Sequence, residues 1–194
     1  MKREITREDI LPMAEYEGLR KEQRKALVET KKHRRLDVGP VCTFYFESFE
    51  TMWSQVHEML FIEKGGEAQI ADELRAYNPL IPKGDELVVT VMFEIDDPDR
   101  RAALLGKLGG VEETAFLRIG GEEVAGTPEE DVDRTNAAGK ASSVQFIHFK
   151  LTPGQIAKFK APGAEVVVGF THPEYGHMAA LPEPVRQALS QDFD

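Results

Sequence analysis

The sequence predicts an α+β fold in which N-terminal helices pack on a mostly antiparallel sheet of about five or six strands. Three observations support this prediction. Apolar residues recur at helical spacing through most of residues 1–84, strand-like runs dominate residues 85–181, and a Gly-Gly pair in that second part signals a hairpin. We expect a single domain over residues 1–194, because the strand predicted at 41–47 needs partners from the later half of the chain.

A first helix is predicted between residues 12 and about 35. Pro12 suits a first helical position, and the stretch 37–40 (DVGP) stops the helix. The positions that keep helical spacing between these limits are Tyr16, Leu19, Gln23, Ala26, Leu27 and Thr30. Residues 41–47 (VCTFYFE) carry β-branched and aromatic side chains on both faces, which indicates a buried strand.

The most apolar predicted helix follows this strand and ends at Gly65-Gly66. Its apolar stripe consists of Phe49, Met52, Trp53, Val56, Met59 and Leu60. At 100° per residue, Glu63 falls within that stripe and His57 flanks it. A third, amphipathic helix then runs through Ile70, Leu74 and Tyr77, and an apolar but irregular loop follows at 80–84.

The later half of the chain shows a strand, a capped helix and a second strand, twice over. Strands are predicted at 86–95 and 111–119, and again at 143–151 and 165–171. The caps of the two connecting helices are Asp97 with Pro98, and Thr152 with Gln155 around Pro153. If the two strands of a unit are parallel neighbours in one sheet, their crossover is right-handed.

Three further segments complete the strand-rich part and the tail. Gly120-Gly121 after Ile119 is a two-residue hairpin signal. Residues 127–142 (TPEEDVDRTNAAGKAS) are polar, and we expect a mobile loop there. Residues 182–194 form a tail with one short helix.

Composition excludes several classes of protein. The chain has 24 Lys and Arg against 34 Asp and Glu, a formal net charge of −10, which disfavours broad binding to nucleic acid. Cys42 is the only cysteine, so no disulfide or cysteine-ligated cluster can form within one chain, and we interpret it as a core residue. No apolar run is long enough to span a membrane, and the N-terminus lacks the apolar core of a signal peptide. We therefore expect an acidic, soluble, cytoplasmic protein.

Positive charge is concentrated in residues 20–35, which hold eight Lys or Arg against Glu22 and Glu29, a local charge of +6. A basic helix end can bind phosphate or RNA. It can equally be a solvated helix face, or dock on an acidic surface of the same or a partner chain. Because no Phe, Tyr or Trp is interleaved for base stacking, we expect no nucleic-acid interface.

The segment from His172 to His177 (HPEYGH) is a candidate metal site at the end of a predicted strand. Imidazole and carboxylate groups are ligands of divalent first-row metals, so His172, Glu174 and His177 are candidates, with His148 from strand 143–151. The alternative is a surface loop in which His172 caps the strand end and Tyr175 packs its ring or contacts a ligand.

Glu63 and His57 are the candidate catalytic residues. A carboxylate on an apolar helix face is costly unless it is paired or protonated. Glu63 turned inward could therefore act as a general acid or base, or as a ligand joined by His148 or His172. The alternative is that Glu63 turns out to solvent or pairs with an Arg, and that His57 is a hydrogen-bonded core residue.

The segment Tyr77-Asn78-Pro79 is a candidate ligand-contacting loop. An Asn side chain can instead satisfy loose backbone groups at a helix end, because its amide both donates and accepts hydrogen bonds. We favour this structural role for Asn78. Contact with a ligand by Tyr77 and Asn78 is the alternative.

Five segments along the chain form a recognisable combination: ITREDILPMAEY (5–16), EMLFIE (58–63), YNPLIP (77–82), FKLTP (149–153) and HPEY (172–175). Together they resemble a bacterial family known as domain of unknown function 3501, over essentially the whole chain. The resemblance implies no specific activity or catalytic residues. It does imply a link to redox or oxidative-stress physiology, with a rubrerythrin-like or iron–sulfur oxidoreductase as partner.

Two functions from different classes remain open. The first is a non-catalytic binding or accessory protein without an evident cofactor, expected as a homo-oligomer that acts beside redox enzymes. The second is a small metal-dependent or acid–base enzyme that uses a divalent ion, Glu63 and some of the histidines. Convergence of these side chains on one pocket would favour the enzyme, and their dispersal would favour the binding protein.

Overall fold

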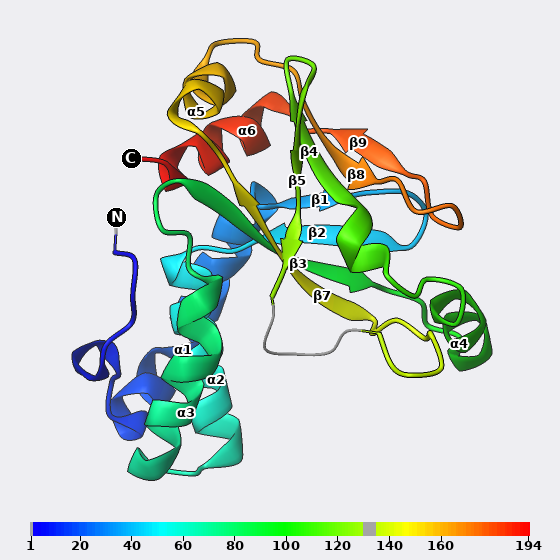
Figure 1. Cartoon of the computed structure of the whole chain (residues 1–194). Helices are drawn as coiled ribbons and strands as arrows, with labels where there is room; N and C mark the ends of the chain where they lie inside the picture. Colours follow the sequence, from blue (N-terminus) through cyan, green and yellow to red (C-terminus); the bar gives the residue numbers. More distant parts are fainter. Residues whose placement is uncertain (1, 130–134) are drawn as a thin grey trace.

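The computed structural model describes residues 2–129 and 135–194 (Figure 1). Within them the chain forms six α-helices and two antiparallel sheets, which confirms the predicted α+β class. The helices are α1 (Met13–Lys32), α2 (Phe49–Glu63), α3 (Glu67–Tyr77), α4 (Pro98–Leu105), α5 (Pro153–Lys160) and α6 (Glu183–Leu189). The first three helices stand together at one side of the strands.

All neighbouring strands of both sheets are antiparallel. The first sheet has the order β1 (Arg35–Asp37), β2 (Cys42–Phe46), β3 (Glu86–Phe93), β7 (Val144–Lys150) and β6 (Thr127–Pro128). The second has the order β5 (Glu122–Ala125), β4 (Ala115–Ile119), β8 (Val166–Phe170) and β9 (Met178–Ala180). The predicted Gly-Gly hairpin joins β4 to β5, with Ile119 paired to Glu122.

The strands divide between two sheets, where the sequence predicted one sheet of five or six. Each strand–helix–strand unit sends its first strand to the first sheet and its second strand to the second: β3–α4–β4 and β7–α5–β8. The parallel crossover considered above therefore does not occur. The additional strands β1, β5, β6 and β9 have only two to four residues each, too few for a period-two pattern to be recognised.

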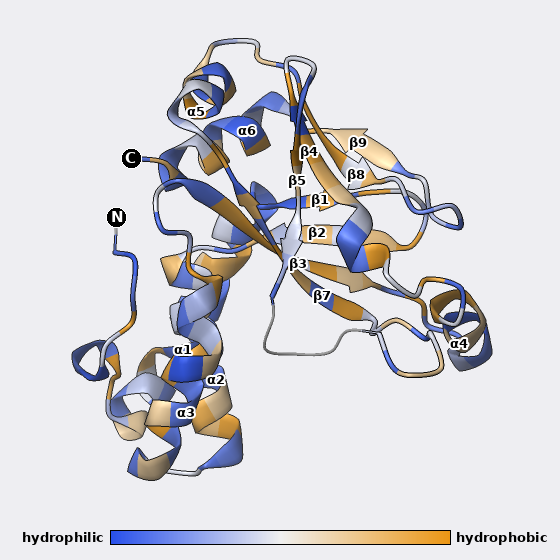
Figure 2. Cartoon of the chain, in the orientation of Figure 1, coloured by the Kyte–Doolittle hydropathy of each residue, from blue (hydrophilic) through white to orange (hydrophobic). Residues whose placement is uncertain are grey.

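Alternation along β3 separates two apolar cores. Leu87, Val89 and Val91 face the second sheet, where they belong to a core that includes Leu117 of β4 and Val168 of β8. Val88 faces the other way, into a core with residues of α2 and α3 and with Ile5 and Ile10 of the N-terminal arm, residues 2–12. Figure 2 shows hydrophobic residues along β3, whereas α1 is largely hydrophilic. One face of the first sheet is thus covered by strands and the other by helices.

Three element boundaries differ from the predictions. Helix α1 ends at Lys32, because Arg34 is buried and donates to the backbone carbonyls of Phe46 and Glu47, so residues 35–37 pair with β2 instead of extending the helix. Residues Val111–Thr114 form a 3-10 turn before β4. Helix α4 ends at Leu105, ahead of the predicted Gly109-Gly110 stop.

Part of the loop predicted at 127–142 is ordered by backbone pairing. Thr127–Pro128 pair with β7, and Ala141 donates its N–H to Leu105. Residues 130–134 of that loop lie outside the described residues. Among the helices of the described chain, none is long and apolar enough to cross a membrane.

Candidate functional site

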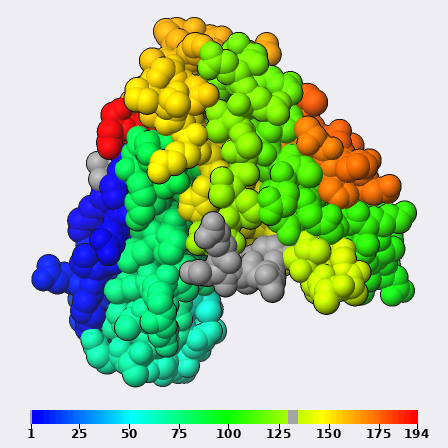
Figure 3. All heavy atoms as spheres, viewed as in Figure 1, coloured from blue at the N-terminus to red at the C-terminus, as the bar shows by residue number. Residues whose placement is uncertain are grey.

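A cavity of about 430 Å³ lies between the helix-facing side of the first sheet and helices α2 and α3. Figure 3 shows these two helices as a cyan-to-green lobe beside the strand-rich part. Three adjacent strands, β2, β3 and β7, supply one side of the cavity, and the end of α1 reaches its rim. The polar lining residues are Lys31, Tyr45, Glu47, Gln55, Tyr77 and Thr90.

Glu47 is the acidic side chain of this lining, and only 7% of its surface is exposed. It follows directly after β2, where Ser48 caps helix α2. Two hydroxyl groups donate to its carboxylate: Thr51 to Oε2 and Thr90 to Oε1, both at 2.6 Å. Because a neighbouring helix and a neighbouring strand each hold one oxygen, the carboxylate is fixed in place.

The rest of the cavity lining is apolar or aromatic. Met52 and Leu80 come from the helical side, and Met92, Val144 and Phe146 come from the strands. A concave, mostly apolar site with a few convergent polar groups is the usual form of a small-molecule site. The volume also falls within the range of about 300–1,000 Å³ that such sites occupy.

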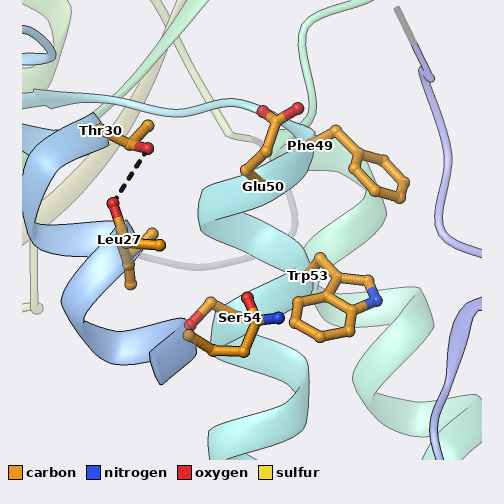
Figure 4. Close-up of a pocket in the computed structure, with 8 residues that line it drawn as sticks. Leu27, Thr30, Phe49, Glu50, Trp53 and Ser54 are labelled. Atoms are coloured by element: carbon orange, nitrogen blue, oxygen red, sulfur yellow. Dashed lines mark hydrogen bonds between the residues drawn. The ribbon is translucent and has the colours of Figure 1, made fainter. Parts of the chain in front are cut away.

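A smaller hollow of about 190 Å³ lies between α1 and the first turns of α2. Figure 4 shows Leu27 and Thr30 of α1 on one side, with Glu50, Trp53 and Ser54 of α2 on the other. The Thr30 hydroxyl donates back to the Ala26 carbonyl of its own helix. This hollow contains no buried charged group, so we place the candidate site in the larger cavity.

His148 lies between two carboxylates on the helix-facing side of β7. Its Nδ1 is 3.0 Å from Glu86 Oε2 and its Nε2 is 2.9 Å from Glu129 Oε2. Burial works to lower the pKa of His148, but hydrogen bonds and charge interactions with Glu86 and Glu129 outweigh it and raise the pKa above its ordinary value. His148 therefore links Glu86 and Glu129 by ion pairs, and both of its ring nitrogens are engaged in these contacts.

The two candidate catalytic residues, Glu63 and His57, lie in different surroundings, one exposed and the other buried. Glu63 lies at the exposed end of α2 and accepts a hydrogen bond from Gln69, so its side chain does not turn inward. The reason is that α2 ends at Glu63, with Lys64 in the left-handed conformation, and its last turn projects beyond the packed core. The alternative that the carboxylate turns to solvent is the one observed.

His57 is a fully buried core residue with hydrogen bonds at both ring nitrogens. Nδ1 is 2.8 Å from the Trp53 carbonyl, and Nε2 accepts the N–H of Leu11 at 3.1 Å. Burial lowers its pKa, although the bond to Trp53 opposes the effect. These contacts match the structural alternative for His57 and leave neither nitrogen available to a substrate.

The HPEYGH segment packs against the fold and does not converge on a metal. His172 is buried: its Nδ1 accepts the N–H of Glu174, and its Nε2 lies 3.3 Å from the Gly109 carbonyl. The ring of His177 packs on Tyr175 and covers Gly39 so closely that a Cβ there would lie 2.6 Å from it. Among residues 2–129 and 135–194, no group of three or more His, Cys, Asp or Glu side chains could hold a metal ion.

Tyr175 has the packing role that the sequence offered as one alternative. Its ring contacts Phe93 and Phe170, and its hydroxyl donates to the Val38 carbonyl at 2.9 Å. Burial raises the pKa of Tyr175 to about 12. The hydroxyl is therefore a neutral group that ties the loop after β8 to the turn between β1 and β2.

The basic segment 20–35 makes ion pairs within the chain. Arg20 binds both oxygens of Glu58 at 2.8 Å, and these hydrogen bonds lower the pKa of Glu58 to about 2. Arg34 is buried against Asp192. Lys32 and Arg35 also form ion pairs, with Glu29 and Asp37, so four cations of the segment have acidic partners in the described chain. This agrees with docking on acidic groups of the same chain.

Tyr77 and Asn78 have different roles. Tyr77 lines the cavity, whereas the Asn78 amide bonds the backbone of Ile5 twice, accepting its N–H at 2.7 Å and donating to its carbonyl at 2.9 Å. The side chain thus pairs with the N-terminal arm as a strand would, and Ile5 is buried as a result. This is the structural role favoured from the sequence.

Replacing Asn78 by Ala is expected to lower the free energy of unfolding by about 1–2 kcal/mol, because both hydrogen bonds to Ile5 are lost. Urea denaturation measures the loss. Asn136→Ala is the matched control, since Asn136 bonds only within an exposed turn. An equal or larger effect at Asn136 would contradict the role assigned to Asn78.

Sequence reasoning missed Glu47 and Thr90 as site residues. The sequence does contain a signal for Glu47, because Tyr45 and Glu47 alternate with Phe44 and Phe46 along residues 41–47. One face of that strand is therefore partly polar. The sequence does not show that Thr90 lies on the adjacent strand. Its position follows from the pairing of β2 with β3, in which Phe46 pairs with Val89 and Tyr45 with Thr90. That pairing joins residues about 45 positions apart.

The fold and this cavity define an α+β protein with two antiparallel sheets and a ligand-sized cavity on the helical side of the first sheet. The family model described as protein of unknown function (DUF3501) matches residues 4–193, so the chain belongs to that family. A crystal structure of a protein of unknown function from Burkholderia pseudomallei K96243 is similar at 35% identity with a TM-score of 0.90, covering 98% of this chain and 99% of that one. No curated protein matches the chain.

Proposed function

We propose that this chain is a non-catalytic binding protein that takes one small, largely apolar ligand into the cavity between the first sheet and helices α2 and α3. The observation that carries the proposal is a cavity of about 430 Å³ in which a buried carboxylate, that of Glu47, lies among apolar and aromatic side chains. An acid–base enzyme built on Glu63 is not favoured, because that carboxylate is exposed at a helix end.

Four expectations from the sequence accompany this proposal. A role beside a rubrerythrin-like or iron–sulfur oxidoreductase rests on the family resemblance, and so does the link to oxidative stress. Assembly as a homo-oligomer and a cytoplasmic location stay predictions from the sequence. The proposal that the cavity binds a ligand does not depend on any of these expectations.

Blocking the cavity tests the proposal. The neutral fluorescent probe N-phenyl-1-naphthylamine is expected to bind saturably at one site, and its fluorescence reports binding. Gln55→Trp is expected to abolish this binding, because Gln55 is half-buried on α2 and lines the cavity. Gln187→Trp, the same change on the exposed surface of α6, is the control and leaves binding intact. Unsaturable binding, or equal binding to both variants, would refute the proposal.

A further inference from the structure

We propose that the ligand of this cavity is an organic amine, with an ammonium group that bonds to Glu47 and an apolar or aromatic body in the rest of the cavity. This inference rests on the proposed function and adds the chemical class of the ligand. It is argued from the hydrogen bonds of Glu47, the positions of the nearby cations and the lining of the cavity.

The Glu47 carboxylate retains capacity to accept hydrogen bonds. An ionised carboxylate has about four acceptor positions. In the described chain, Thr51 and Thr90 each supply one hydroxyl donor, at 2.6 Å. An ammonium has three donors, and two of them can bond to the two positions that remain. Such charge-assisted hydrogen bonds are about twice as strong as neutral ones.

No cation of the described chain forms an ion pair with this carboxylate. Arg34 lies next to Glu47 in space but donates to its main-chain carbonyl, at 2.7 Å, and directs its other donors to Asp192 and Phe46. Lys31 lines the cavity from the exposed end of α1. A buried carboxylate without a charged partner is costly, and a bound ammonium would remove that cost.

The remaining lining suits the body of such a ligand. Tyr45, Tyr77 and Phe146 offer aromatic rings, and Met52 and Met92 offer flexible apolar contacts. Aromatic faces attract cations, so an ammonium is compatible with the rings as well as with the carboxylate. Glu94, which accepts a hydrogen bond from the Tyr45 hydroxyl, adds a second negative charge near this lining. Both acidic groups oppose an anionic ligand.

The experiment compares phenethylamine with 2-phenylethanol, a neutral molecule of nearly the same shape. Isothermal titration calorimetry at pH 7 gives both affinities for the full chain. We expect the amine to bind at least about tenfold more tightly, the factor that corresponds to one charge-assisted hydrogen bond. Glu47→Gln is expected to remove this preference and leave the affinity for the alcohol within about threefold. Glu50→Gln, the same change at an exposed site on α2, is expected to preserve it.

Each outcome distinguishes the inference from the proposed function. Binding of both compounds with equal affinity overturns the amine inference and leaves a cavity that binds apolar molecules. Persistence of the amine preference in Glu47→Gln also overturns it, because the carboxylate would then not be the recognition group. Binding of neither compound overturns both proposals. The comparison in the unaltered chain needs no variant, so it stands even if Glu47→Gln does not fold.

Discussion

Asp192→Ala is expected to lower the free energy of unfolding by about 3–5 kcal/mol, the largest effect of any single change proposed for this protein. Asp192 is completely buried and holds Arg34 through two oxygens, at 2.5 and 3.2 Å. Removal of the carboxylate leaves a guanidinium buried without its countercharge. Because Arg34 also bonds the backbone at Phe46 and Glu47, the disturbance reaches the strand that carries the candidate site.

Urea denaturation followed by circular dichroism measures this effect. Asp194→Ala is the control two residues away: Asp194 pairs with Arg3 at an exposed site, and this exposed pair is expected to contribute little to stability. The double variant Arg34→Met with Asp192→Leu is expected to recover much of the loss, since no charge then remains buried. A loss at Asp192 no larger than that at Asp194 would show that the buried pair does not hold the C-terminal tail.

His57→Ala is expected to cost about 2–4 kcal/mol of stability. The change leaves the Leu11 N–H without its acceptor and opens a void beside Trp53, whose ring centroid lies 3.9 Å from that of His57. Thermal and urea unfolding measure the loss. His33→Ala provides a control, because His33 is exposed just after α1. Equal losses from both variants would contradict a structural role for the buried ring.

The stabilisation by His57 is expected to depend on pH with a definite sign. Burial places its pKa below the ordinary value of about 6.5, so the unfolded chain binds the proton more readily than the folded chain. The contribution is present above about pH 6.5 and is lost as the pH falls through and below that value. The stability difference between the unaltered chain and His57→Ala should therefore shrink at pH 5 compared with pH 7.5. If the stability difference grew on acidification, the assigned lowering of the His57 pKa would be wrong.

Much of the helical structure was predictable because its signals are local. Helix α5 has the predicted capping box of Thr152 and Gln155, and α2 begins and ends within a residue or two of the predicted limits. Strand β3 also lies where its alternating apolar residues place it. Caps, stripes and alternation depend on neighbours within a few positions, so a single sequence displays them.

The candidate site was not predictable to the same degree. Glu63 was assigned to an apolar stripe by its angle around the helix, but helical angle does not tell where the covering elements stop. The alternation around Glu47 indicates only a partly polar strand face, and the importance of Glu47 arises from Thr90 on the next strand and from the cavity opposite. Such relations require the pairing of distant strands.

The amino-acid order therefore specifies the class of fold, most of the helices and the central strands, and the core role of Cys42, which is buried. Long-range pairing specifies the division into two sheets, the buried Arg34–Asp192 pair and the cavity around Glu47. The physical reason is range: backbone propensity and side-chain periodicity act over one or two turns, whereas burial of a charge depends on every element that packs around it.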